Sequence, residues 1–154
     1  MIQLQKILAA VDFSAHTEIV LRYASELATA FRAEVLLCHV IAKADALSQL
    51  PPTGEGYFPA NYEELQRQVA QQESEKALRA AGLSGARTVI VAGAPFVEIV
   101  RLARAEGVDL IIIGTHGRGA VAHAFLGSVA EKVVRKAPCP VLTVREGEHD
   151  FVAP

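Results

Sequence analysis

The chain has 154 residues, of which 51% are apolar and 21% are charged, and its formal net charge is -2. This composition excludes a disordered chain, and the length fits one domain over residues 1–154 with a substantial core. The small net charge gives no reason to expect a nucleic acid or a membrane surface as partner. The first residues do not resemble a secretory leader, and no apolar run approaches the roughly 20 residues of a membrane span, so we expect a cytoplasmic protein.

Strand and helix signals alternate along the chain. Apolar stretches predict strands at 6–12, 33–41, 87–93, 108–114 and 140–145. Stretches with helical period predict helices at 15–32, 62–81, 95–106 and 128–137. The first, second and fourth strands are nearly continuous apolar runs, which is typical of strands buried on both faces. We therefore expect an open α/β sheet of parallel strands joined by right-handed helical crossovers.

Each predicted helix carries an apolar stripe that we expect to face the sheet. The stripes comprise Ile19, Val20, Tyr23, Ala24, Leu27, Ala28 and Phe31; Tyr62, Leu65, Val69, Ala77, Leu78 and Ala81; Phe96, Ile99, Val100 and Ala103; and Val129, Val133, Val134 and Ala137. Pro95 suits the first turn of its helix, and Gly82 and Pro138 suit the residues that follow a helix end.

Several segments stand apart from this alternation. Residues 43–61 form a long connection, which we expect to be either a functional lid or a disordered loop, and residues 146–154 form a tail. Cys38 and Cys139 are far apart in the sequence and predict neither a metal site nor a redox pair. Residues 114–145 hold five basic residues against Glu131 alone, so an anionic ligand would be drawn to this region.

Glycines are dense in the stretch that follows the fourth strand. Gly114, Gly117 and Gly127 precede Ser128 with the spacing G-x2-G-x9-G-S. Ser128 and Glu131 match a capping box, in which the serine is the plain N-cap of the last helix. The same helix start could instead bind a phosphate, because it offers free N–H groups and a glycine that lets an anion approach. The residues alone leave both interpretations open.

Two familiar phosphate motifs do not account for these glycines. The sequence contains no G-x-x-x-x-G-K-[ST] loop, which excludes a Walker-type site. Residues 117–122 match G-x-G-x-x-A, but they follow the fourth strand rather than the first. No acidic residue ends a following strand where a ribose ligand would be expected. We therefore reject a dinucleotide site.

The glycine spacing resembles the nucleotide-binding pattern of the universal stress protein family, in its ATP-binding branch. The resemblance covers nearly the whole chain: KILAAVDFS opens the first strand, HV ends the second, GTHG follows the fourth, and GSVAE and PCPVLTV come after it. It implies a doubly wound parallel sheet of five strands in the order 3-2-1-4-5, with helices on both faces. It also implies that ATP is held where the strand order reverses.

The resemblance implies a set of nucleotide-binding residues. Ala10, Val11 and Asp12 would lie against the adenosine, Val40 would line the adenine pocket, Ile113 and Gly114 would lie near the ribose, and Gly117, Arg118, Gly127, Ser128 and Val129 would surround the phosphates. Asp12 would either contact the nucleoside or hold Mg²⁺ through water, and the sequence does not choose between these roles.

The last strand, at 140–145, is an edge strand in this order. Exposed edges invite pairing with another chain. The resemblance implies a homodimer formed by this strand, to which Val141, Leu142 and Val144 are suited.

The function that we expect is stress signalling in which ATP is bound rather than rapidly turned over, and an unidentified protein partner recognises the bound form. At most slow hydrolysis is expected, because His116 is more often polar surface than a proton carrier and no other general base is well supported. We expect His39, inside an apolar run, to be hydrogen-bonded within the sheet. The alternative is an interaction protein that uses this fold without nucleotide. An adenylate-transferring enzyme is disfavoured, because residues 12–16 lack the S-G-G-x-D loop of such enzymes.

Overall fold

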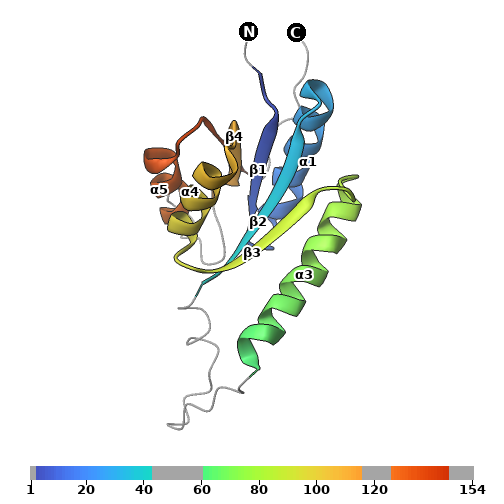
Figure 1. Ribbon diagram of the computed structural model, residues 1–154, viewed down its shortest axis with the longest axis vertical. Coiled ribbons are helices and arrows are strands. Elements are labelled where there is room, and N and C mark those ends of the chain that lie inside the picture. The colour runs from blue at the N-terminus through green and yellow to red at the C-terminus, as the bar shows by residue number, and fades with distance from the viewer. Residues whose placement is uncertain (1–2, 43–60, 116–125, 146–154) are drawn as a thin grey trace.

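The computed structural model describes residues 3–42, 61–115 and 126–145, within which strands and helices alternate along the chain (Figure 1). The elements are β1 (Lys6–Val11), α1 (His16–Phe31), β2 (Glu34–Ala42), α3 (Tyr62–Ala80), β3 (Arg87–Gly93), α4 (Pro95–Glu106), β4 (Leu110–Gly114), α5 (Ser128–Lys136) and β5 (Val141–Val144). The predicted elements agree with these bounds to within one or two residues.

The five strands form one parallel sheet in the order β3-β2-β1-β4-β5. This arrangement confirms the predicted fold class and strand order. The order reverses between β1 and β4, where Ala10 lies opposite Ile113. The carboxyl ends of these two strands therefore flank the point at which doubly wound sheets bind ligands.

The helices cover both faces of the sheet (Figure 1). On the side of α4 and α5 the core includes Leu8, Leu36 and Ile111, whereas on the side of α1 and α3 it includes Ile7 and Leu37. Successive strand residues point to opposite faces, so a sheet covered on both sides requires the continuous apolar runs seen in the sequence. None of the helices in the described ranges is long and apolar enough to cross a membrane.

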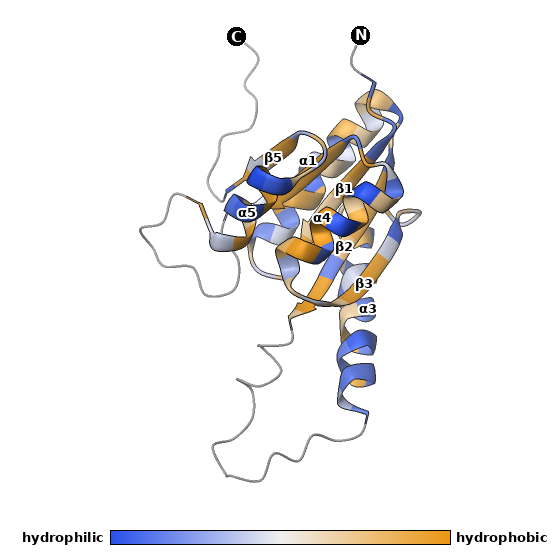
Figure 2. Cartoon of the chain, turned by 60° about the vertical axis from the view of Figure 1, so that its left-hand side comes forward, coloured by the Kyte–Doolittle hydropathy of each residue, from blue (hydrophilic) through white to orange (hydrophobic). Residues whose placement is uncertain are grey.

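The predicted stripe on α3 is confirmed at its carboxyl-terminal end, where Leu78 is buried and Ala77 and Ala81 pack against the core, and is wrong nearer the start of the helix. Leu65 and Val69 are 53% and 51% exposed, and the residues that α3 buries are Ala70, Ser74 and Leu78. Figures 1 and 2 show that the amino-terminal half of α3 projects beyond the strands, so the sheet does not cover it. Nearer the sheet, the buried Ser74 hydroxyl has a hydrogen-bond partner, because it donates to the Ala70 carbonyl at 2.7 Å.

Three helix signals are confirmed. Pro95 occupies the first turn of α4. Gly82 follows α3 with a φ of +71°, and the N–H of Leu83 donates back to the Leu78 carbonyl at 2.8 Å, which closes the helix end. Pro138 follows the last residues of α5.

The predicted capping box at the start of α5 is wrong. Gly127 is the N-cap residue and no side chain caps the helix. Ser128 is already the first helical residue, so its hydroxyl is not placed to accept from the N–H three residues on. The Glu131 carboxylate instead pairs with Arg135 at 3.0 Å. Val134, predicted to face the sheet, is 47% exposed on the same helix.

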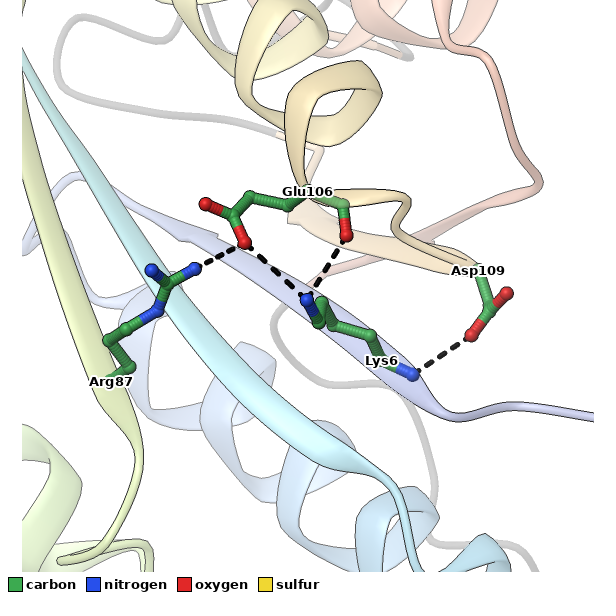
Figure 3. Close-up of polar contacts among 4 residues, drawn as sticks. All are labelled: Lys6, Arg87, Glu106 and Asp109. Atoms are coloured by element: carbon green, nitrogen blue, oxygen red, sulfur yellow. Dashed lines mark hydrogen bonds and ion pairs between the residues drawn. The ribbon is translucent and has the colours of Figure 1, made fainter.

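Charged side chains join the amino ends of the strands to the end of α4 (Figure 3). Lys6 Nζ lies 3.4 Å from Glu106 Oε2, and Arg87 pairs with the same oxygen. Asp109 Oδ2 accepts the backbone N–H groups of Gln5 and Lys6 at 2.8 and 2.9 Å. The hydrogen bond from Arg87, reinforced by Lys6, lowers the pKa of the Glu106 carboxyl. This amino-edge cluster ties β1, β3, α4 and the start of β4 together.

Candidate functional site

Several predicted nucleotide-binding residues lie in one apolar wall near the carboxyl edge of the sheet. Ala10 and Ile113 are each 6% exposed and belong to the core on the side of α4 and α5. Val40 and Val129 are half-buried and pack against the same cluster. The side chain of Val11 belongs to the core on the opposite side of the sheet. The structure therefore brings four of the predicted residues together and turns the Val11 side chain away from them.

The loop after β1 is held by an unusual set of contacts. Asp12 Oδ1 accepts the N–H of Ser14 at 3.0 Å, which forms a tight turn. Phe13 has a φ of +59°, a left-handed conformation that is uncommon for a bulky residue. Its ring lies against the ring of His39, with the centroids 4.3 Å apart. His39 Nδ1 in turn donates to the Val11 carbonyl at 3.0 Å, which confirms that this histidine is hydrogen-bonded within the sheet.

Two buried hydroxyl groups beside this loop have no hydrogen-bond partner among the described residues. These are Ser14 Oγ in the loop and Thr17 Oγ1 in the first turn of α1. Buried polar atoms are almost always paired, so unpaired ones mark a place where the fold has not been optimised for stability alone. Sequence reasoning did not identify them, because serine and threonine after a strand are ordinary turn residues.

Thr115, at the end of β4, is hydrogen-bonded to both β5 and the start of α5. Its N–H donates to the Val144 carbonyl of β5 at 2.7 Å, and its carbonyl accepts the N–H of Gly127. Its side chain is buried, with 6% exposed. This residue positions the start of α5 beside the switch point. The sequence carries no signal for that role beyond its place after an apolar strand.

The start of α5 offers backbone donors close to this edge. The first intrahelical bond runs from the N–H of Glu131 to the Gly127 carbonyl at 2.9 Å. The N–H groups of Ser128, Val129 and Ala130 precede it and have no acceptor within the helix. Together with the helix dipole they favour an anion at this position.

The backbone of Gly127 does not itself require glycine. Its φ of -66° and ψ of 154° are extended values that any residue adopts. Gly114 lies within β4 and is not among the positive-φ glycines of the described chain, which are Gly82, Gly93 and Gly107. A need for positive φ therefore explains neither glycine. The absence of a side chain matters only if something approaches the backbone closely.

The remaining predicted residues are either outside the described residues or in β5. His116, Gly117 and Arg118 fall in residues 116–125, outside the described residues. In β5, an edge strand as predicted, Val144 is 1% exposed and packs into the core on the side of α1, whereas Val141 and Leu142 are half-buried. Pairing with another chain would thus use the backbone of β5 and not the Val144 side chain.

The sequence and the fold of this chain are both similar to those of known proteins. The sequence model of the Universal stress protein family matches residues 3–145. Universal stress protein MJ0577 of Methanocaldococcus jannaschii is 35% identical over 156 aligned residues, covering 92% of this chain and 94% of that protein. A solved structure of MJ0577 superimposes with a TM-score of 0.76 at 32% identity, over 96% of this chain and all (100%) of that one.

Two further similar structures contain adenine nucleotides. A universal stress protein crystallised in complex with cAMP has a TM-score of 0.65 at 25% identity, over 94% of this chain and 98% of that one. The universal stress protein of Archaeoglobus fulgidus in complex with dAMP has a TM-score of 0.59 at 25% identity, over 93% and 98% of the two chains.

Proposed function

The chain belongs to the universal stress protein family, and we propose that it binds ATP, with Mg²⁺, between the carboxyl ends of β1 and β4. The apolar wall of Ala10, Val40 and Ile113 would hold the adenosine. The N–H groups at the start of α5 would receive the phosphates. Asp12 at the end of β1 would contact the nucleoside or hold Mg²⁺ through water. The complexes of two relatives with cAMP and dAMP support an adenine nucleotide as the ligand.

The observation that carries this proposal is the backbone conformation of Gly127. Its dihedral angles are open to every amino acid, so a positive φ does not account for the glycine, and we infer that its bare backbone leaves room for a phosphate. The absence of a side-chain cap has the same consequence, because the Ser128 hydroxyl is not committed to the helix start. Both features suit a phosphate cradle better than a plain N-cap.

We further propose that the protein binds ATP without rapid turnover, in the cytoplasm, and that another protein recognises the bound form. Two titratable side chains at the described part of the site have structural contacts. The Asp12 carboxylate accepts from the Ser14 N–H, and the His39 ring donates to the Val11 carbonyl and packs on Phe13. These contacts support roles in shaping the loop rather than in proton transfer.

The decisive experiment is calorimetric titration of nucleotide-free protein with Mg-ATP, in the parent chain and in Gly127→Val. We expect the substitution to weaken binding by at least about 100-fold, roughly 3 kcal/mol, because the valine would block two or three charge-assisted N–H contacts. Gly85→Val is the matched control, since a side chain at Gly85 meets nothing within 4 Å and its φ is not positive. Equal ATP affinity in the two variants, both folded by circular dichroism, would contradict the phosphate cradle.

The alternative is an interaction protein on the same fold that needs no nucleotide. The feature that favours it is β5, whose outer edge is unpaired in the described sheet. We propose that this edge forms the homodimer. Light scattering at micromolar concentration tests that proposal separately, and a monomeric mass would contradict it. A parent chain that dimerises but takes up neither ATP nor cAMP would favour the alternative.

A further inference from the structure

A shallow groove of about 600 Å³ lies on the outer side of α4 and extends to α5. The lining residues run from Phe96 to Ala105 on α4, and Lys136 contributes from the end of α5. We call this the α4–α5 groove. None of its lining residues belongs to the proposed nucleotide site, so nucleotide binding does not account for it.

The floor of the α4–α5 groove is apolar. Phe96, Val97 and Val100 lie on one side of α4, and Val97 is 43% exposed. Lys132 of α5 sits over the Phe96 ring, with its ammonium 5.2 Å from the ring centroid. This contact holds α5 beside the groove and places a further positive charge near its floor.

The rim of the groove is basic and only partly neutralised. Arg101 pairs with Glu98 at 2.7 Å. The ion pairs found within residues 3–42, 61–115 and 126–145 include neither Arg104 nor Lys136. Two cations therefore border an apolar floor without a carboxylate of their own. Figure 2 shows that hydrophobic (orange) and hydrophilic (blue) residues alternate along α4.

We propose that the α4–α5 groove is a docking site for an acidic amphipathic helix of a partner protein. Apolar side chains of such a helix would cover Val97, and flanking carboxylates would pair with Arg104 and Lys136. A symmetric groove-to-groove contact between two copies fits poorly, because it would bring cations against cations. A nucleic acid would leave the valine floor without a function, and the chain as a whole carries a net charge of -2.

The test uses a fluorescently labelled peptide with leucines at helical spacing and glutamates and alanines between them. The control peptide has the same leucines, with lysine in place of each glutamate. We expect the acidic peptide to bind at least about tenfold more tightly, because like charges across an interface are repelled. Raising the salt concentration should weaken this binding, since rim charges are screened.

Two variants locate the binding site. Arg104→Glu combined with Lys136→Glu should weaken the binding of the acidic peptide by at least about tenfold. Val97→Asp should weaken it by a similar factor. The matched control is Lys76→Glu combined with Arg79→Glu, an equal charge change on the exposed surface of α3, which should leave the affinity within about twofold.

Three results would overturn the proposal: equal binding of the two peptides, equal loss in the α3 control, or a stronger preference for a single-stranded oligonucleotide or for anionic phosphatidylserine vesicles than for the acidic peptide. All groove substitutions are at exposed positions, and a thermal melt of each variant verifies that it is folded.

Discussion

The two ends of the same parallel sheet are built in opposite ways. At the amino end, the amino-edge cluster pairs the charges of Lys6, Arg87 and Glu106, and Asp109 accepts two backbone N–H groups. At the carboxyl end, Phe13 holds a left-handed conformation, and Thr17 is among the residues that bury an unpaired hydroxyl. Both ends hold one non-glycine residue in a left-handed conformation, Arg32 at the amino end and Phe13 at the carboxyl end. Among the described residues, the buried hydroxyls without a partner lie at the carboxyl end.

This difference indicates that the carboxyl end of the sheet keeps features that lower the stability of the fold. Strained backbone and unpaired polar atoms persist only where the surrounding structure holds them, and they concentrate at functional sites. The carboxyl end is also the end at which doubly wound sheets bind ligands. Substitutions at the two ends should therefore separate stability from binding.

The largest effect is expected at Asp109, in the amino-edge cluster. Asp109→Ala removes the acceptor of two N–H groups, so we expect a loss of about 1–3 kcal/mol in the free energy of unfolding. Asp109→Asn keeps an acceptor oxygen and should lose less. Urea denaturation measures both variants, and titration with Mg-ATP should show unchanged affinity. A marked loss of ATP affinity in folded Asp109→Ala would contradict the idea that the amino end serves stability and the carboxyl end serves binding.

A smaller effect of opposite sign is expected at Thr17. Thr17→Val replaces an unpaired buried hydroxyl by a methyl group of similar shape, so stability should stay level or rise by up to about 1 kcal/mol. Thr17→Ser keeps the hydroxyl, loses a buried methyl group, and should cost about 1 kcal/mol. Urea denaturation of the pair provides the comparison. If Thr17→Val proves the less stable of the two, the hydroxyl is paired in solution.

The smallest effect is the acid dependence of the amino-edge cluster. Arg87, and then Lys6, lower the pKa of Glu106 in the folded chain below its ordinary value of 4.5. The resulting stabilisation is fully present above the unfolded pKa and is lost as the pH falls through the folded pKa. Glu106→Gln should therefore flatten the fall of stability below about pH 4.5. Melting temperatures across the acid range measure this, and parallel curves for the two proteins would contradict it.

The fold could be predicted largely because strands covered on both faces need continuous apolar runs. Burial on the helices was harder to predict. The stripe on α3 included Leu65 and Val69, yet amphipathic spacing does not tell how far the sheet extends beneath a helix. The capping box at Ser128 failed because its pattern does not specify which residue is the first helical one.

The candidate site depended on the family resemblance more than on spacing. Glycine density identified the segment around Gly127, but the wall of Ala10, Val40 and Ile113 comes from strands far apart in the chain. The contact of Phe13 with His39 could not have been predicted, because a left-handed aromatic residue contradicts every local preference. Its cause lies in tertiary contacts that no short pattern encodes.

The nine residues of α5 span only about 13 Å, and both ends of this helix have a proposed partner. Nucleotide would sit at its first turn and an acidic helix would bind near Lys136 in its last. A ligand that shifts this short helix at one end would change the affinity at the other end. Such linkage is reciprocal: whatever factor ATP imposes on the affinity of the partner, the partner imposes on ATP. A bound partner that prefers the nucleotide-loaded form would then prolong the lifetime of ATP on the protein.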